Sequence, residues 1–249
     1  MKSQNSNLFA LRIIWCGRKI SKDGVPFDSA YLEGLTENPP PERGKQLQDL
    51  LTGLNWIRSN IPDYARNLAT LQQLLKRCQG QINSANASKL SRISSVHAVT
   101  WKADHDTAFS RVNEVLADAV TLPHPKQDYE LCLFIHASDP HWGIILTQVS
   151  KKQLKVSVHD HEHEPLPFFS GSFNRSQRHR SIIDKEAFPI MELLHKLRHC
   201  LLSDNLFRSL NKNRNFMFVF DPISKTQTSR TKLWITWANG LQSFKDFTI

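Results

Sequence analysis

The segment YELCLFIHASDPHWGIILTQV at 129–149 decides the fold class of this chain. β-Branched and aromatic residues dominate both of its halves, and the turn-forming cluster SDPH separates them. This pattern predicts two strands that pair through a tight turn. The stretches KQLKVSV at 152–158 and PLPFFSGSF at 165–173 are predicted to extend the same sheet.

Helical periodicity lies on both sides of this predicted sheet. Leucines at 47, 50, 51 and 54 follow the i, i+3, i+4, i+7 spacing, and Ile61-Pro62 is expected to end that helix. Pro189 is expected to kink a later helix or to mark its late start. Further elements are predicted as helices at 68–77, 100–119, 184–202 and 229–239, and as a buried strand at 215–222. The chain is therefore predicted to have an α+β or mixed α/β fold.

Two local features indicate how the chain is divided. Residues 8–28, LFALRIIWCGRKISKDGVPFD, predict a small hairpin because a Lys-Asp-Gly turn stands between apolar runs. Residues 81–98 are polar and serine-rich, which predicts an exposed linker. We therefore expect a helical module over 1–80, a linker over 81–98 and a second domain over 99–249.

Composition limits the class of protein. The chain has 249 residues, 40% of them hydrophobic, enough for one large or two small packed domains. No stretch reaches the roughly 18 apolar residues of a membrane helix, and the N-terminus lacks the apolar core of a signal peptide. We expect an intracellular protein without a membrane partner, in either cytoplasm or nucleus. The net charge is +9, and residues 1–95 hold 13 basic and 7 acidic groups, which fits either nucleic-acid contact there or ordinary solubility.

Histidines alternate with acids at 158–164, VHDHEHE. On a strand, His159, His161 and His163 would share one face and could bind zinc or copper. Successive side chains on one face stand about 6 to 7 Å apart, however, which is too far to close around one ion unless the chain bends. The alternative is a solvated loop between strands.

Three dispersed acids form a second candidate site. Asp139 is predicted near a strand end, Glu186 in the first turns of a helix and Asp221 at the end of a strand. A two-magnesium phosphodiesterase needs carboxylates that converge from such elements. The sequence pattern by itself does not show that these three converge.

Ordered motifs resemble the region after the polymerase palm in gypsy-type LTR retrotransposon reverse transcriptases. WCGRKISKDG at 15–24 and PPPERGKQLQDLLTGLNWIRSNIP at 39–62 are similar to the family's FLG-like strand, KDG turn and following helix. The later motifs keep the family's order: WKADHDTAF at 101–109, IHASDPHWGIILTQ at 135–148, HEPLPFFSGSF at 163–173, DKEAFPI at 184–190, LRHCLL at 197–202 and FVFDP at 218–222. The resemblance covers about residues 11–240.

The resemblance implies a fold and an activity. Residues 1–80 would be a thumb-like remnant of a reverse transcriptase, and 99–249 a ribonuclease-H-like domain, truncated at its C-terminus, with a mixed five-stranded sheet flanked by helices. Such domains cut RNA in RNA:DNA hybrids with Mg²⁺ or Mn²⁺. Glu186 and Asp221 would be the catalytic metal ligands. The implied contacts with the hybrid or another nucleic acid are Trp15, Gly17, Arg18, Lys19 and Lys22, and other pol-derived segments are implied partners.

The chain also departs from the family pattern. His136 stands where the family's first metal-ligand Asp is found, and Mg²⁺ binds poorly to a site in which imidazole replaces a carboxylate. Asp139 is a conceivable substitute only if the chain turns there. The polymerase motif Tyr-x-Asp-Asp does not occur in the sequence, and the family's fourth acid would lie beyond Ile249.

Three hypotheses follow. The first is a pol-derived fragment whose ancestral endoribonuclease activity on RNA:DNA hybrids is impaired. The second is a non-catalytic module that binds nucleic acid through shape and phosphates. The third, a zinc hydrolase built on His159, His161 and His163, is the least favoured.

Overall fold

The computed structural model describes residues 10–80, 99–117, 119–201, 207–210 and 247–248. Contacts divide the chain into two compact units. The first unit comprises the residues up to Ile61 together with Asn67–His124, and the second comprises Pro62–Arg66 together with the residues from Pro125 onward. None of the described helices is both long enough and apolar enough to cross a membrane.

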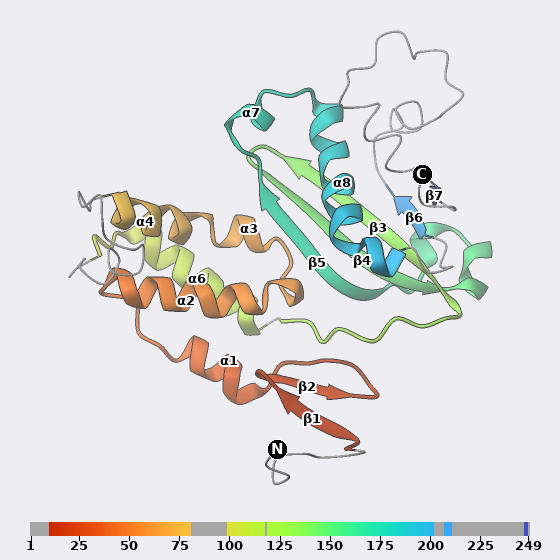
Figure 1. Cartoon of the computed structure of the whole chain (residues 1–249), viewed down its shortest axis with the longest axis horizontal. Coiled ribbons are helices and arrows are strands. Elements are labelled where there is room, and N and C mark those ends of the chain that lie inside the picture. Colours follow the sequence, from red (N-terminus) through yellow and green to blue (C-terminus); the bar gives the residue numbers. More distant parts are fainter. Residues whose placement is uncertain (1–9, 81–98, 118, 202–206, 211–246, 249) are drawn as a thin grey trace. The chain divides into compact units, whose positions relative to one another are not determined.

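The first unit contains a two-stranded hairpin and a group of helices (Figure 1). Its elements are β1 (Arg12–Trp15), β2 (Arg18–Ser21), α1 (Ser29–Thr36), α2 (Gly44–Trp56), the 3-10 helix η2 (Arg58–Asn60), α4 (Ala69–Gly80) and α6 (Ala103–Ala117). The residues of the short helix α3 (Tyr64–Asn67) are divided between the two units, since Tyr64–Arg66 group with the second and Asn67 with the first. The predicted hairpin and helices of this half are therefore confirmed.

The core of the first unit forms where α4 packs against α2 and α6. The predicted leucine stripe of α2 is buried, and Leu71 and Leu74 on α4 and Phe109 and Val112 on α6 are buried as well. Each such side chain contributes about 1.5–3 kcal/mol when it is removed from water. The leucines at i, i+3 and i+4 therefore form the face through which α2 packs against α4.

The compact units differ from the domain boundary predicted at residue 99. Helix α6 was expected to open the second domain, but it packs on α4 and groups with the first unit. The reason is its apolar face, whose residues Val112 and Leu116 are almost fully buried. The predicted linker, 81–98, lies outside the described residues.

The second unit is built on a mixed five-stranded sheet with the strand order β5-β4-β3-β6-β7. Strands β3, β4 and β5 pair antiparallel, whereas β6 joins β3 and β7 joins β6 in parallel. The bounds are β3 (Tyr129–Ser138), β4 (His141–Ser150), β5 (Glu164–Ser172), β6 (Phe207–Leu210) and β7 (Phe247–Thr248). The predicted mixed five-stranded sheet is confirmed.

One face of this sheet is covered by α8 (Ile182–Leu201), as Figure 1 shows. Ala187, Ile190 and Leu194 of the helix pack against Leu133 and Ile144 of the sheet. Truncation of a buried leucine in such a core typically costs about 2–5 kcal/mol. The helix begins before the predicted residue 184 and contains Pro189, so the late start allowed by the sequence is wrong.

The connection between β4 and β5 corrects one sequence prediction. KQLKVSV at 152–158 was expected to form a strand, but the chain forms the 3-10 helices η3 (Lys151–Lys155) and η4 (Val158–Asp160). Its apolar residues are too few and too exposed for a strand, since Val156 is 52% exposed. The strand predicted at 215–222 and the helix predicted at 229–239 lie outside the described residues.

Candidate functional site

His136 lies on the face of β3 that is turned away from α8. Its neighbours Ile135 and Ala137 pack into the core beneath α8, and alternation along the strand places His136 on the opposite side. The imidazole is exposed. The position at which the resembling family has its first Asp is therefore open to solvent and to a ligand.

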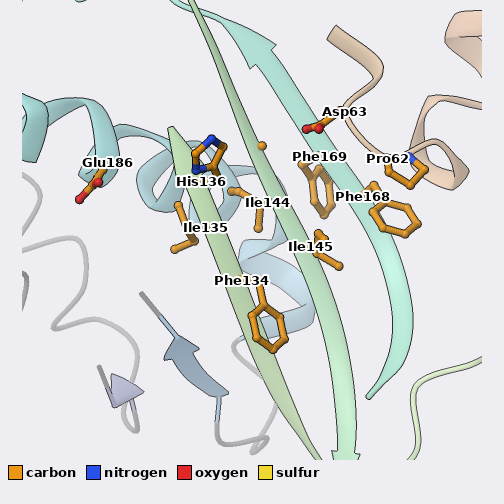
Figure 2. Close-up of a pocket in the computed structure, with 11 residues that line it drawn as sticks. Pro62, Asp63, Phe134, Ile135, His136, Ile144, Ile145, Phe168, Phe169 and Glu186 are labelled. Atoms are coloured by element: carbon orange, nitrogen blue, oxygen red, sulfur yellow. The ribbon is translucent and has the colours of Figure 1, made fainter. Parts of the chain in front are cut away.

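A pocket of about 370 Å³ surrounds this position in the second unit (Figure 2). It brings His136 and Glu186, one from a strand and the other from α8, into the lining of the same cavity. The full lining is Pro62, Asp63, Phe134, Ile135, His136, Gly143, Ile144, Ile145, Phe168, Phe169 and Glu186. The cavity thus combines a largely apolar floor with two carboxyl groups and one imidazole.

Pro62 and Asp63 line this pocket, which the sequence analysis did not predict, and the segment that contains them is held against the sheet. The backbone N–H of Ala65 donates to Ser170 Oγ at 3.0 Å, and Arg66 Nη2 donates to Ser138 Oγ at 2.6 Å. A Cβ at Gly143 would come within 3.1 Å of Asp63 Oδ1, so the glycine lets this segment approach the sheet closely. Pro62 was interpreted only as a helix stop, and a contact this distant in sequence has no local signal.

Asp139 lies at the β3–β4 turn but does not join His136 as a substitute ligand. Its Oδ1 accepts a hydrogen bond from Arg178 Nε at 2.8 Å, and its Oδ2 is 3.6 Å from Lys185 Nζ. The hydrogen bond from Arg178 lowers the pKa of this carboxyl group. Both of its oxygens therefore have cationic partners.

We call Arg66, Arg178 and Lys185 the cationic cluster, because they converge around the β3–β4 turn. His141 starts β4 at this turn, and its Nδ1 lies 3.0 Å from Ser172 Oγ. Burial lowers the pKa of His141, and the positive charges of Arg66 and Arg178 lower it further. The carboxylates of Asp63 and Asp139 act in the opposite direction and raise it.

The described residues do not make a magnesium site. No group of three or more His, Cys, Asp or Glu side chains in the described ranges could hold a metal ion. Glu186 is half-buried and His136 supplies a nitrogen where a hard oxygen would be needed. Asp221, the other predicted ligand, lies outside the described residues, so its role stays a prediction.

The histidine-rich segment does not form a strand. His159 lies in η4, and His161 and His163 follow it before β5 begins. The one-face arrangement considered for a strand is therefore wrong. The segment connects β4 to β5, as the alternative of a loop between strands predicted, but it is only partly solvated. His159 is exposed, whereas the other two are partly buried.

The N-terminal hairpin has its tight turn at Cys16-Gly17, where both residues have positive φ angles, 50° and 75°. The predicted Lys-Asp-Gly turn also exists, since Ser21 and Gly24 bond to each other across it, but it follows β2. Gly17 fits this position because a Cβ there would lie 2.8 Å from the Tyr31 ring.

The predicted nucleic-acid contacts of this hairpin differ in their surroundings. Arg18 stacks over the rings of Phe27 and Trp56, at 4.5 and 5.8 Å, and burial lowers its pKa. Lys19 pairs with Asp28 at 2.7 Å. Trp15 and Lys22 are exposed. Two of the predicted cations are thus already used to hold the hairpin together.

Comparisons with known proteins agree with this fold. The family described as the RNase H-like domain found in reverse transcriptase matches residues 101–208. The chain is 21% identical over 231 residues to the "Retrovirus-related Pol polyprotein from transposon opus" of Drosophila melanogaster, covering 93% of this chain and 21% of that protein. It is 23% identical over 226 residues to the Transposon Tf2-3 polyprotein of Schizosaccharomyces pombe, covering 90% of this chain and 15% of that protein. The chain thus spans about a fifth or less of these relatives.

Solved structures with similar folds are foamy viral protease-reverse transcriptases. One, in complex with RNA/DNA hybrid, has a TM-score of 0.69 and 16% identity, covering 98% of this chain and 30% of that chain. Another, in complex with dsDNA, has a TM-score of 0.66 and 16% identity, covering 97% of this chain and 44% of that chain. At this identity the likeness shows the fold alone. Together with the family and the Pol relatives, it confirms the resemblance to a retrotransposon pol segment that motif order predicted.

Proposed function

We propose that this chain is a reverse transcriptase/ribonuclease-H-like segment of a retrotransposon Pol protein, that it binds RNA:DNA hybrid, and that its ancestral endoribonuclease activity is impaired. The observation that carries the proposal is His136. The motif resemblance aligns it with the family's first metal-ligand Asp, and the residue lies on β3 and lines one pocket with Glu186. We infer that a ribonuclease-H-like fold is retained with an altered ligand in this pocket.

Impaired hydrolysis follows from the ligand chemistry. Two-metal cleavage requires carboxylate oxygens that hold both ions and neutralise their charge. A neutral imidazole supplies neither the negative charge nor the hard oxygen that Mg²⁺ and Mn²⁺ prefer. Glu186, with Asp221 as the second proposed ligand, would then bind Mg²⁺ or Mn²⁺ only weakly.

Binding of nucleic acid is supported by charge at the end of the sheet. The cationic cluster places three basic side chains around the β3–β4 turn, and Asp139 is the acidic partner of two of them. Phosphate groups are the natural counterions of such an arrangement, and arginines bind them with two hydrogen bonds. Structures with the same fold bind RNA/DNA hybrid and dsDNA. We therefore infer that a duplex backbone contacts this end of the second unit.

Cleavage of a labelled RNA:DNA hybrid with Mg²⁺ and with Mn²⁺ tests the impairment directly. We expect little or no cleavage by the unaltered protein and a clear gain in His136→Asp. His136→Asn, which also removes the imidazole but adds no charge, is the matched control and should stay inactive. Efficient cleavage by the unaltered protein would refute the impairment, because another group would then complete the site.

The second candidate function is a non-catalytic hybrid-binding module, which the cationic cluster favours. It predicts hybrid affinity that falls steeply with salt and no cleavage even by His136→Asp. Arg178→Gln should bind the hybrid more weakly than the unaltered protein does. Across a salt series, its affinity should also decrease less steeply with the logarithm of the salt concentration. Lys152→Gln, beyond the other end of β4, is the control and should keep the slope of the unaltered protein.

A further inference from the structure

Two partly buried histidines stand side by side just before β5, in a place that the proposed function does not use. The ring centroids of His161 and His163 are 5.6 Å apart, and their planes are tilted by 51°. Each ring has one buried nitrogen without a hydrogen-bond partner in the described part of the chain, His161 Nδ1 and His163 Nε2. Because buried polar atoms nearly always have a partner, such a pair of nitrogens indicates a bound water or ion.

The hydrogen bonds of His163 allow a ring that carries its proton on Nδ1. Nδ1 lies 2.9 Å from Thr147 Oγ1, and that hydroxyl is 3.4 Å from the carbonyl oxygen of Cys132, to which it can donate its single proton. In that arrangement the hydroxyl oxygen accepts from the Nδ1–H of His163. The neutral ring then has its lone pair on Nε2, the nitrogen without a partner.

The same argument applies to His161. Its Nε2 lies 3.1 Å from the carbonyl oxygen of Val156, which can only accept. Nε2 therefore carries the proton, and Nδ1 of the neutral ring has the lone pair. With these tautomers, both histidines present a bare nitrogen while the other ring nitrogen is held by an oxygen, which is the arrangement that orients histidines bound to metals.

We propose that His161 Nδ1 and His163 Nε2 bind one divalent cation of borderline softness, such as Zn²⁺, whose remaining positions are filled by water. Two imidazoles that share a tetrahedral ion have ring centroids roughly 5 to 6 Å apart, since each nitrogen lies about 2.0–2.1 Å from the metal. The observed separation falls in this range. The site differs from the three-histidine strand considered from the sequence, because His159 is exposed on η4.

The ligand chemistry of the pair suits a cation of this kind, because imidazole binds a metal through a neutral nitrogen. Imidazole nitrogen suits Zn²⁺, Cu²⁺ and Ni²⁺, whereas Mg²⁺ prefers oxygen ligands. The two histidines therefore favour a different kind of ion from the one proposed near Glu186.

Calorimetric titration of the full chain, without an affinity tag, with Zn²⁺ tests the proposal. We expect one Zn²⁺ per chain and a rise in Tm on binding. His161→Ala and His163→Ala should each weaken binding roughly tenfold or more and abolish the rise in Tm. His159→Ala, from the same segment, is the matched control and should bind as the unaltered protein does, and Mg²⁺ should give no rise in Tm.

A second measurement on the unaltered protein keeps the test independent of variant folding. ¹⁵N NMR of the metal-free imidazoles should show a proton on Nε2 of His161 and on Nδ1 of His163. The opposite tautomers would overturn the proposal. So would Zn²⁺ binding that is absent, that survives in the His161→Ala/His163→Ala double variant, or that is lost in His159→Ala.

Discussion

His136 and Gly143 face each other directly across the β3–β4 ladder. Because glycine has no side chain, the imidazole meets no cross-strand neighbour on its own face of the sheet. His136 is also exposed, while the residues on either side of it in β3 contribute to the core under α8. A substitution at position 136 should therefore change the ligand that this side chain offers without changing the stability of the fold.

Substitution of His136 should leave folding almost unchanged. We expect the free energy of unfolding of His136→Asp and of His136→Asn to lie within about 0.5 kcal/mol of the unaltered protein, as is usual for exposed positions. Urea denaturation of the three proteins measures this. A loss of several kcal/mol would show that position 136 supports the sheet, and the cleavage comparison would then need a different variant.

Arg18 should behave as a structural residue of the hairpin. It lies over the Phe27 ring and donates to the carbonyl oxygen of Trp56 at 3.3 Å, so Arg18→Ala removes a cation–π contact and a hydrogen bond. We expect a loss of about 1–2 kcal/mol of stability. Lys22→Ala, on the exposed turn that follows β2, should change stability by less than about 0.5 kcal/mol. Equal effects in thermal unfolding of the two variants would contradict this assignment.

Asn60 should be among the least tolerant polar positions of the first unit. Asn60 is fully buried, and its side-chain Nδ2 donates to the backbone carbonyl oxygen of Val120 at 2.8 Å. The backbone carbonyl oxygen of Asn60 accepts from the Val120 N–H at 3.2 Å. Asn60→Ala removes the donor to the Val120 carbonyl oxygen and should lower the free energy of unfolding by about 1–3 kcal/mol. Asn55→Ala, at an exposed position of α2, serves as the comparison in the same denaturation series. The prediction fails if the two variants unfold at the same denaturant concentration.

The pKa of His141 should report the cationic cluster. Arg178→Gln removes one positive charge and releases Asp139 from its partner, and both changes favour the charged imidazole. The pKa of His141 should therefore rise toward its ordinary value, as measured by NMR titration of its ring protons. Lys152→Gln should not move it. No change in Arg178→Gln would mean that burial alone sets this pKa, and a fall would contradict the assignment of Arg178 as a group that lowers it.

The sign of the accompanying stability change follows from linkage. A histidine whose pKa is lowered by folding destabilises the folded state as the pH drops below its unfolded pKa, because the unfolded chain binds the proton more readily. The unaltered protein should therefore lose stability on acidification through the titration range of His141. The Arg178→Gln variant should lose less stability from the titration of His141.

Periodic elements could be predicted from the sequence. The leucine stripe of α2, the apolar face of α8 and the β3–β4 pair all follow from spacing, because burial of one face fixes the helical or strand period. The family resemblance, carried by the order of the motifs, predicted the mixed five-stranded sheet, which the structure confirms. What these elements share is that a local pattern specifies each of them.

Features that depend on distant partners could not be predicted. The docking of Pro62–Arg66 beside Gly143 and the pairing of Asp139 with Arg178 and Lys185 join segments whose sequences carry no mutual signal. The turn at Cys16-Gly17 has a weaker local signature than the Lys-Asp-Gly run beside it, and so the sequence located only the second turn. The composition of the candidate site therefore needed the structure.

The order of strands in the sheet has a consequence for how the second unit reaches its native state. Strands β5, β4 and β3 follow one another in the chain and pair as neighbours, whereas β6 reaches β3 only after the chain has passed through α8. Short loops close at a smaller entropic cost than long ones, so contacts within the three antiparallel strands can form before the parallel pair. We therefore expect Leu146→Ala, in the antiparallel part, to slow refolding, and Leu194→Ala, on α8, mainly to speed unfolding.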